Sequence, residues 1–231
     1  MKSLYPFFAL AFTAVTAFAQ APNYSREIFS DDFSGSGFGK RWGHYKSSSV
    51  IKDGVLVGIT AETSDHPAVD SITFPGEKDL QVSVKFRYVS DKAKGFNVWF
   101  DDKNYKESHA GHICSVTVNP TGVNIADAKT GTFRNDLYEK KKASPSSLSA
   151  EEKEFLKKMT KSVPVKLSLN EWHTLVIQTN GDTVSVNIDH KDVGSFTSPG
   201  VAHDSKTLVS LTTNRVDVEY DDFSIKATAK K

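Results

Sequence analysis

Apolar and polar residues alternate with a period of two along most of this chain, which is the pattern of half-buried β-strands. The alternation is clearest in 170–192, where two such segments flank an Asn-Gly-Asp sequence at 180–182. These turn residues tolerate the positive φ of a tight turn, so a hairpin is predicted here. A longer strand is predicted over 79–89 and another over 96–101. We therefore expect short strands joined by tight turns.

Residues 129–163 break this alternation. They contain a run of three lysines, a Ser-Pro-Ser-Ser sequence and then a capping box at 149–152. The capping box predicts one short helix that ends near Met159. We interpret this region as an insertion that lies over the rest of the fold. About a dozen short strands with one short helix favour an all-β fold, and we predict a two-sheet antiparallel jelly-roll sandwich.

The first residues carry the features of a secretory signal peptide. Lys2 precedes an apolar run at 4–18, and Ala17 and Ala19 form a small-x-small cleavage motif. An uncleaved membrane anchor is the alternative. The cleavage motif, followed by Pro22, favours removal.

The chain is therefore divided into four predicted parts. Residues 1–19 are the signal peptide, 20–27 a linker, 28–227 the jelly-roll domain and 228–231 a frayed tail. We expect the mature protein to be secreted, to the extracellular space or the periplasm, and to have no membrane segment.

Charge and cysteine content narrow the range of partners. The 231 residues carry a formal net charge of +1, which gives no global reason to expect nucleic acid as a partner. Cys114 is the single cysteine, so the chain cannot form an internal disulfide. It alternates in phase with Val116 and Val118, which favours a buried thiol over a nucleophile.

Five short segments, taken in order along the chain, carry a resemblance to a known superfamily. They are Asp31-Asp32-Phe33 with Trp42, then 53–58, 171–177, 184–187 and 221–225. Over 28–227 the chain resembles the concanavalin A-like lectin/glucanase superfamily, and it is most similar there to the secreted jelly-roll domains grouped as 3-keto-disaccharide hydrolases. The resemblance implies a two-sheet sandwich with one concave face and a carbohydrate as substrate. The better-known glucanases carry Glu-x-Asp-x-x-Glu on one strand, and this sequence has no such segment.

The strands predicted at 79–89 and 96–101 present polar side chains away from the core. If the two strands are neighbours, these residues share one face. An indole covers the apolar face of a sugar ring, and polar groups bind its hydroxyls, so a carbohydrate site is predicted. The alternative is a solvated face or a face covered by the insertion. The predicted substrate-binding residues are Lys85, Arg87, Asn97 and Trp99, with Asp101 beside them.

Asp101, Asp102, His109 and His112 flank one predicted loop. A carboxylate within reach of an imidazole makes an acid/base pair, and two histidines with two aspartates could also hold a metal. The alternative is a polar surface loop, with His112 at the edge of the core. For the hydrolysis that the resemblance implies, we predict Asp101 as the base, assisted by His112 or His109.

The chain carries a similar Asp-Asp-Phe sequence near each end. Terminal strands of a jelly roll commonly lie side by side, which would bring four carboxylates together. Like charges that close need a cation or exposure to solvent, and calcium accepts carboxylate oxygens. A structural calcium is therefore one hypothesis, and capping of turns by aspartate is the alternative. The candidate ligands are Asp31, Asp32, Asp221 and Asp222.

The patterns and the resemblance together favour a secreted carbohydrate-active domain. Hydrolysis of a glycoside on the concave face is one hypothesis. A non-catalytic glycan-binding module on the same face is the second, and an adhesion domain without a small ligand is the third. A catalytic site requires an acid and a base beside the sugar platform, whereas a lectin requires only the platform.

Overall fold

The computed structural model describes residues 22–144 and 146–229. The predicted signal peptide at 1–19, with 20–21 of the linker and 230–231 of the tail, lies outside the described residues. Within those two ranges, no helix has both the length and the apolar character needed to cross a bilayer.

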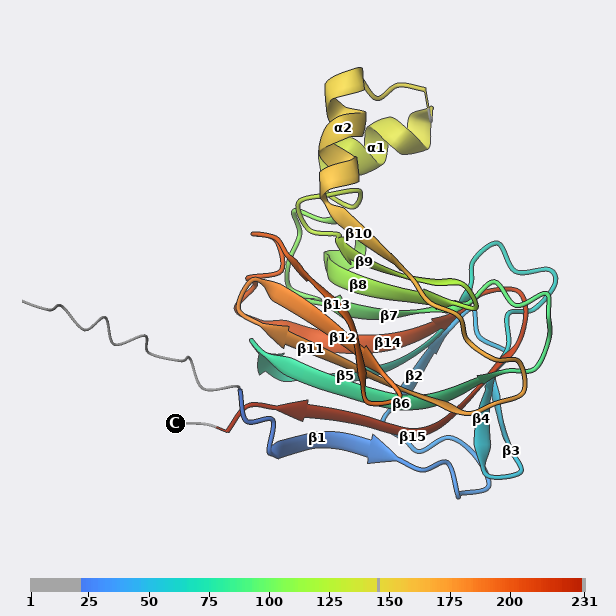
Figure 1. The fold of residues 1–231 in the computed structure, drawn as a ribbon. Coiled ribbons are helices and arrows are strands. Elements are labelled where there is room, and N and C mark those ends of the chain that lie inside the picture. Colours follow the sequence, from blue (N-terminus) through green and yellow to red (C-terminus); the bar gives the residue numbers. More distant parts are fainter. Residues whose placement is uncertain (1–21, 145, 230–231) are drawn as a thin grey trace, which may run out of the picture.

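Two antiparallel sheets face each other and form a sandwich (Figure 1), as predicted for a jelly roll. We name each sheet after its central strand. The β6 sheet has the order β13 (Lys191–Thr197), β12 (Thr183–Ile188), β11 (His173–Asn180), β6 (Leu80–Tyr88), β15 (Val218–Ala227), β4 (Val55–Gly58) and β3 (Val50–Lys52), with β1 (Arg26–Asp31) also paired to β15. The β7 sheet has the order β10 (Thr160–Pro164), β9 (Gly122–Asp127), β8 (His112–Asn119), β7 (Phe96–Asp101), β14 (Lys206–Thr213), β5 (Ala68–Glu77) and β2 (Trp42–Tyr45).

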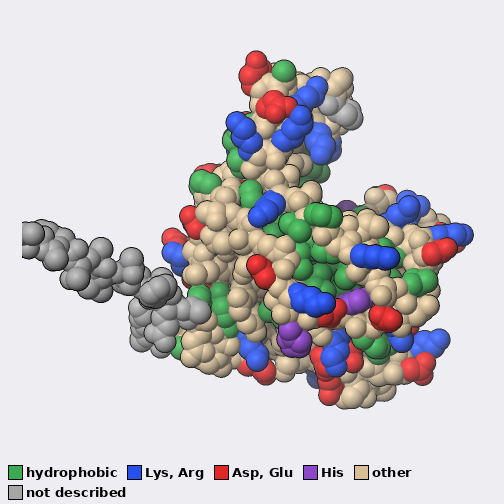
Figure 2. Space-filling view, viewed as in Figure 1, with side chains coloured by type: hydrophobic (Ala, Val, Ile, Leu, Met, Phe, Trp, Pro, Cys, Tyr) green, Lys and Arg blue, Asp and Glu red, His purple; other side chains and the backbone are tan. Residues whose placement is uncertain are grey.

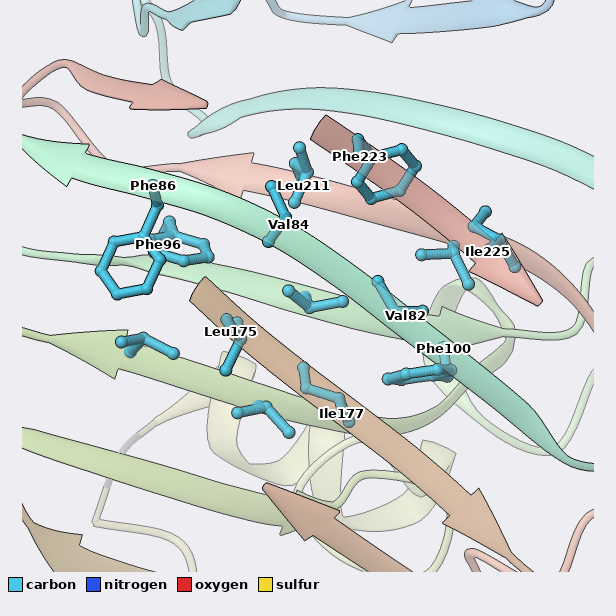
Figure 3. Packing of buried hydrophobic residues seen from close by; sticks show 14 of the residues in the cluster. Val82, Val84, Phe86, Phe96, Phe100, Leu175, Ile177, Leu211, Phe223 and Ile225 are labelled. Atoms are coloured by element: carbon cyan, nitrogen blue, oxygen red, sulfur yellow. The ribbon is translucent and has the colours of Figure 1, made fainter. Parts of the chain in front are cut away.

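The core lies between the sheets and follows directly from the alternation in the sequence. On β6 every second residue from Leu80 to Tyr88 is buried, and the residues between them are partly exposed. Figure 3 shows side chains of both sheets meeting in this layer, among them Phe86 and Phe96. Their rings lie 5.0 Å apart between centroids. Cys114 is fully buried, as its alternation in phase with Val116 and Val118 predicted. Burial raises the pKa of this thiol to about 12.

The predicted hairpin and the predicted pairing of the chain ends are both confirmed. β11 and β12 pair up to Asn180 and Thr183, and Gly181 adopts a φ of +57° in the turn. β1 pairs with β15, with Asp31 opposite Phe223. β1 begins at Arg26, two residues inside the predicted linker, so the ordered domain is slightly longer than expected.

The prediction of one helix in the insertion was wrong. The region holds two helices, α1 (Asn135–Ala143) and α2 (Ala150–Lys158), followed by β10, which joins the edge of the β7 sheet. The capping box is confirmed, since Ser149 and Glu152 each accept a hydrogen bond from the other's backbone N–H. α1 was missed because it has only one buried residue and little apolar character.

The sequence predicted an insertion that lies over the rest of the fold, and this prediction was wrong for the two helices. They form an arm that projects from one end of it, and Figure 2 shows lysine and arginine side chains along this arm. The arm joins the β7 sheet at the point where β9 ends and β10 begins. This position places the arm beside the outer face of the β7 sheet.

Candidate functional site

The outer face of the β7 sheet carries a cleft of about 620 Å³. Its floor consists of the residues that alternate with core residues on β5, β14 and β7, and its walls come from loops and from the arm. The volume is within the range of small-molecule sites. The lining residues are Tyr45, His66, Pro67, Val69, Ser71, Asn97, Trp99, Asp101, His109, Ala110, His112, Phe133, Tyr138, Leu208, Ser210 and Thr212.

Trp99 lies in this cleft because Val98 and Phe100 are fully buried on the opposite side of β7. Strand alternation therefore turns the indole outward, as predicted. The His112 ring lies 4.3 Å from the Trp99 ring between centroids, and the Phe133 ring meets it edge-on at 5.2 Å. The indole is thus held between a strand residue and a residue of the insertion.

Asp101 and His112 form the predicted pair. The Nδ1 atom of His112 lies 2.7 Å from Oδ1 of Asp101, and the side chains are 18% and 9% exposed. A register shift between Phe100 and Asp101 brings Asp101 opposite His112, at the ends of β7 and β8. Burial raises the pKa of Asp101, and the hydrogen bond with His112 opposes that rise. Because Nδ1 of His112 is hydrogen-bonded to Asp101, Nε2 is the ring nitrogen that can exchange a proton with a ligand.

His109 also lines the cleft, on a short 3₁₀ turn from His109 to Gly111. Gly111 has a φ of +75°, and a Cβ there would lie 2.1 Å from the carbonyl oxygen of Asp102, so the turn requires glycine. The His109 ring stacks on Tyr138 of α1 at 3.8 Å and lies 6.2 Å from the His112 ring. Burial, and then the nearby His112, lower the pKa of His109.

Asp102 does not belong to this group, although it follows Asp101 in sequence. Its Oδ2 lies 2.9 Å from Nε2 of His203, and its Oδ1 accepts a hydrogen bond from the Asn104 N–H. Burial by itself would raise the pKa of Asp102, but the hydrogen bonds from His203, Asn104 and Thr207 outweigh it, and the pKa is lowered. The predicted cluster of two aspartates and two histidines is therefore divided. In the described ranges no three or more His, Cys, Asp and Glu residues gather in a way that could hold a metal.

The prediction that Lys85 and Arg87 share the face of Trp99 was wrong. β6 and β7 belong to different sheets, because the segment that joins them crosses from one sheet to the other. Lys85 pairs with Asp222 at 2.5 Å, and Arg87 pairs with Glu219, both on the outer face of the β6 sheet. Of the predicted substrate-binding residues, only Asn97 and Trp99 line the cleft.

Three of the four terminal aspartates, Asp31, Asp32 and Asp222, line one open hollow beside β1 and β15, but among the described residues no three such groups are placed to hold a metal. Asp31 accepts hydrogen bonds from the Phe33 N–H at 2.8 Å and from Nε1 of Trp42 at 2.8 Å. Asp32 accepts hydrogen bonds from Ser34. The two remaining carboxylates belong to Asp222, which pairs with Lys85, and to Asp221, which accepts from the Asp222 N–H. The strand pairing was therefore predicted correctly, but each carboxylate caps or pairs locally, as in the alternative interpretation.

Several lining residues were not predicted from the sequence. Phe133 and Tyr138 come from the insertion, where no alternation indicated a direction for their side chains. Tyr45 and His66 form the opposite wall, with ring centroids 5.3 Å apart. The sequence indicated only weakly that hydroxyl side chains lie in the floor of the cleft. Ser210 and Thr212 alternate with Val209 and Leu211, but serine and threonine on a strand are equally typical of a solvated face.

No protein-family model and no curated protein sequence matches this chain. Among solved structures, it is similar to a sialidase, with a TM-score of 0.61 and 13% identity over 89% of this chain. The matched part is only 19% of the sialidase chain. It is also similar to the laminarinase from Rhodothermus marinus, with a TM-score of 0.60 and 10% identity over 91% of this chain and 100% of that one.

A carbohydrate-binding module, CBM66 from Bacillus subtilis, has a TM-score of 0.51 and 11% identity, over 81% of this chain and 96% of the module. At such low identity these likenesses bear on the fold alone. They show that the chain has the two-sheet jelly-roll fold of these proteins.

Proposed function

We propose that this protein is a carbohydrate-active domain that cleaves a glycoside in the cleft of the β7 sheet. One observation carries the proposal, namely the Asp101–His112 pair that lies directly beside the Trp99 ring. A sugar that binds against the uncovered part of the indole would lie in the same cleft as the imidazole. The neighbours with this fold include enzymes and a module whose names refer to carbohydrates, which supports the same ligand class.

The chemistry available in the cleft favours proton abstraction over the usual pair of carboxylates. Glycosidases generally use two carboxyl groups on either side of the scissile bond. Asp101 is the single carboxylate among the described residues that line the cleft, and it is engaged with His112. An imidazole held by a carboxylate is instead suited to act as a general base.

A 3-keto-glycoside is a substrate that such a base can cleave. The base removes the hydrogen on C2, next to the carbonyl, and that electron pair forms a C1=C2 double bond. The C1–O bond breaks, and the leaving oxygen takes a proton from an acid. Water then adds across the double bond, which completes hydrolysis without any oxidant. We assign His112 as the base, which then gives this proton to the leaving oxygen, Asp101 as its positioning partner and His109 as a hydrogen-bond donor beside it. The resemblance to 3-keto-disaccharide hydrolases supports this substrate class.

The test compares a 3-keto-disaccharide with its unoxidised parent, using chromatography to detect the released sugar. Wild-type protein is expected to cleave the first and to leave the second intact. Asp101→Asn should lower turnover about 100-fold or more, which is the usual contribution of a positioned acid/base group. Asp189→Asn is the matched control, because Asp189 pairs with His173 at the same 2.7 Å on the β6 sheet. Equal losses in both variants would contradict the assigned roles.

A glycan-binding module without catalysis is the second candidate, and the single carboxylate of the cleft favours it. In that case glycans bind, no product appears from either disaccharide, and Trp99→Ala abolishes binding.

Secretion is part of the same proposal. N-terminal sequencing of exported protein should begin at Gln20 or Pro22, and a mature chain that still begins at Met1 would contradict it.

A further inference from the structure

The wall of the cleft opposite the insertion carries an exposed aromatic residue. Tyr45 ends β2, the edge strand of the β7 sheet, and its side chain is 57% exposed although it lines the cleft. A single exposed aromatic residue needs no explanation by itself. Here the His66 ring contacts it edge-on at 5.3 Å, which holds the phenol ring at the rim of the cleft.

The strand register measures how far this residue lies from Trp99. Tyr45 is opposite Val69 on β5, which is opposite Thr212 on β14, and Thr212 is opposite Asn97 on β7. Tyr45 and Trp99 are therefore three strands apart, roughly 14 Å at about 4.8 Å per strand. This backbone distance is greater than the length of one sugar ring.

Between the two aromatic residues, the floor of the cleft carries small polar side chains. Ser71 is opposite Ser210, and Ser210 is opposite Trp99, so small hydroxyl side chains cross the sheet in one row. Thr212 adds a further hydroxyl in the next row. Small side chains leave the middle of the face hollow, with Ser210 and Thr212 at its bottom, 2% and 4% exposed. Ser71 is partly exposed, so its hydroxyl is the most accessible of the row to donate or accept a hydrogen bond.

We infer that Tyr45 is a second sugar-binding platform, and that the cleft takes a linear oligosaccharide of three or more units across the strands from β2 to β7. One unit stacks on Trp99, the hydroxyl row binds the middle of the chain, and a later unit stacks on Tyr45. The inference rests on the proposed function, because it assumes that a carbohydrate occupies the Trp99 end. It adds a length requirement that a disaccharide site does not have.

The experiment measures affinity against glycan length. The probes are an array of linear mono-, di-, tri- and tetrasaccharides of glucose, galactose, mannose, xylose and N-acetylglucosamine, with titration calorimetry on each hit. For wild-type protein, affinity should rise at least tenfold between the disaccharide and the trisaccharide. In Tyr45→Ala this rise should disappear while affinity for the shorter members is kept, and Tyr45→Phe should restore it.

Trp172→Ala is the control, because Trp172 is an exposed aromatic residue, 37% accessible, that is absent from the cleft lining. It should leave the whole series unchanged. Thermal melting of each variant shows whether the fold is intact. If wild-type protein binds glycans and Tyr45→Ala matches it at every length, the second platform is overturned while the proposed function stands. If no glycan binds wild-type protein, the second platform is overturned, and the cleavage assay with the 3-keto-disaccharide decides the proposed function separately.

Discussion

The outer faces of the two sheets have the same strand alternation but different side chains. On the β6 sheet, the charged side chains of β6 and β15 pair with one another, as Arg87 does with Glu219 while its guanidinium lies 4.7 Å over the Trp172 ring. On the β7 sheet, Ser71, Ser210 and Thr212 lie in the floor of the cleft, between the Trp99 and Tyr45 rings. Alternation therefore identifies a strand and its outward positions. The size and pairing of the outward side chains decide which face can receive a ligand.

The largest effect that separates the two faces is expected from their tryptophans. Trp99→Ala should weaken glycan binding about 100-fold, or roughly 3 kcal/mol, because it removes the stacking platform. It should also lower the free energy of unfolding by about 1–2 kcal/mol, since His112 and Phe133 partly cover the indole. Trp172→Ala should leave binding unchanged. Calorimetry and denaturant unfolding measure both quantities, and equal binding losses in the two variants would erase the distinction between the faces.

Filling the hollow tests the role of small side chains. Ser210→Tyr places a ring in the floor of the cleft and should lower glycan affinity about tenfold or more, or about 1.4 kcal/mol. Ser83→Tyr makes the same change on β6, where Ser83 faces away from the core. That variant should bind as the wild type does. Unchanged affinity in Ser210→Tyr would mean that the ligand does not reach the floor.

A smaller effect is expected from pH at the cleft. The pKa of His109 is lowered in the folded protein, whereas an unfolded histidine titrates near about 6.5. Below that pH the unfolded state binds more protons at this site, so His109 makes the free energy of unfolding fall as pH decreases. His109→Gln should have a shallower decrease between about pH 7 and pH 5. Identical pH profiles of urea unfolding for the two proteins would contradict this.

The smallest effect is expected from the ion pairs of the β6 sheet. Arg87→Met removes the pair with Glu219 but keeps an apolar side chain beside Trp172. Because the side chains are 32% and 19% exposed, the loss should be about 0.5–1 kcal/mol in the free energy of unfolding. The difference from wild type should shrink at about 1 M salt, where charges are screened within roughly 3 Å. A loss several times larger would show that this face is more than a solvated surface.

The sequence was sufficient for the strands and for the direction of each side chain on them. It placed Trp99 and Asp101 outward on β7, and both line the cleft. It was not sufficient for the partners of each strand. β6 and β7 are consecutive and only a short segment separates them, which normally indicates a hairpin, yet that segment joins the two sheets. Lys85 and Arg87 were assigned to the wrong face for that reason alone.

The walls of the cleft could not be predicted for a different reason. Tyr138 lies on a helix with one buried residue, so no apolar stripe indicated where the ring would go. His109 was named from the sequence as a candidate, but its place against Tyr138 was not, because its turn depends on the positive φ of Ala110 and Gly111. Such positions are fixed by tertiary contacts, and the local pattern of residues carries little information about them.

The weak attachment of the helical arm has a consequence for motion. Leu137 is the buried residue of α1, and α2 has none, so little apolar surface holds the arm to the sandwich. Segments with few buried contacts unfold locally at a free-energy cost well below that of the whole domain. When α1 opens in this way, Tyr138 leaves His109 while the two sheets stay folded. Amide hydrogens of the arm should therefore exchange with solvent sooner than those of β7 and β8, and the environment of His109 should change at the rate at which the arm opens.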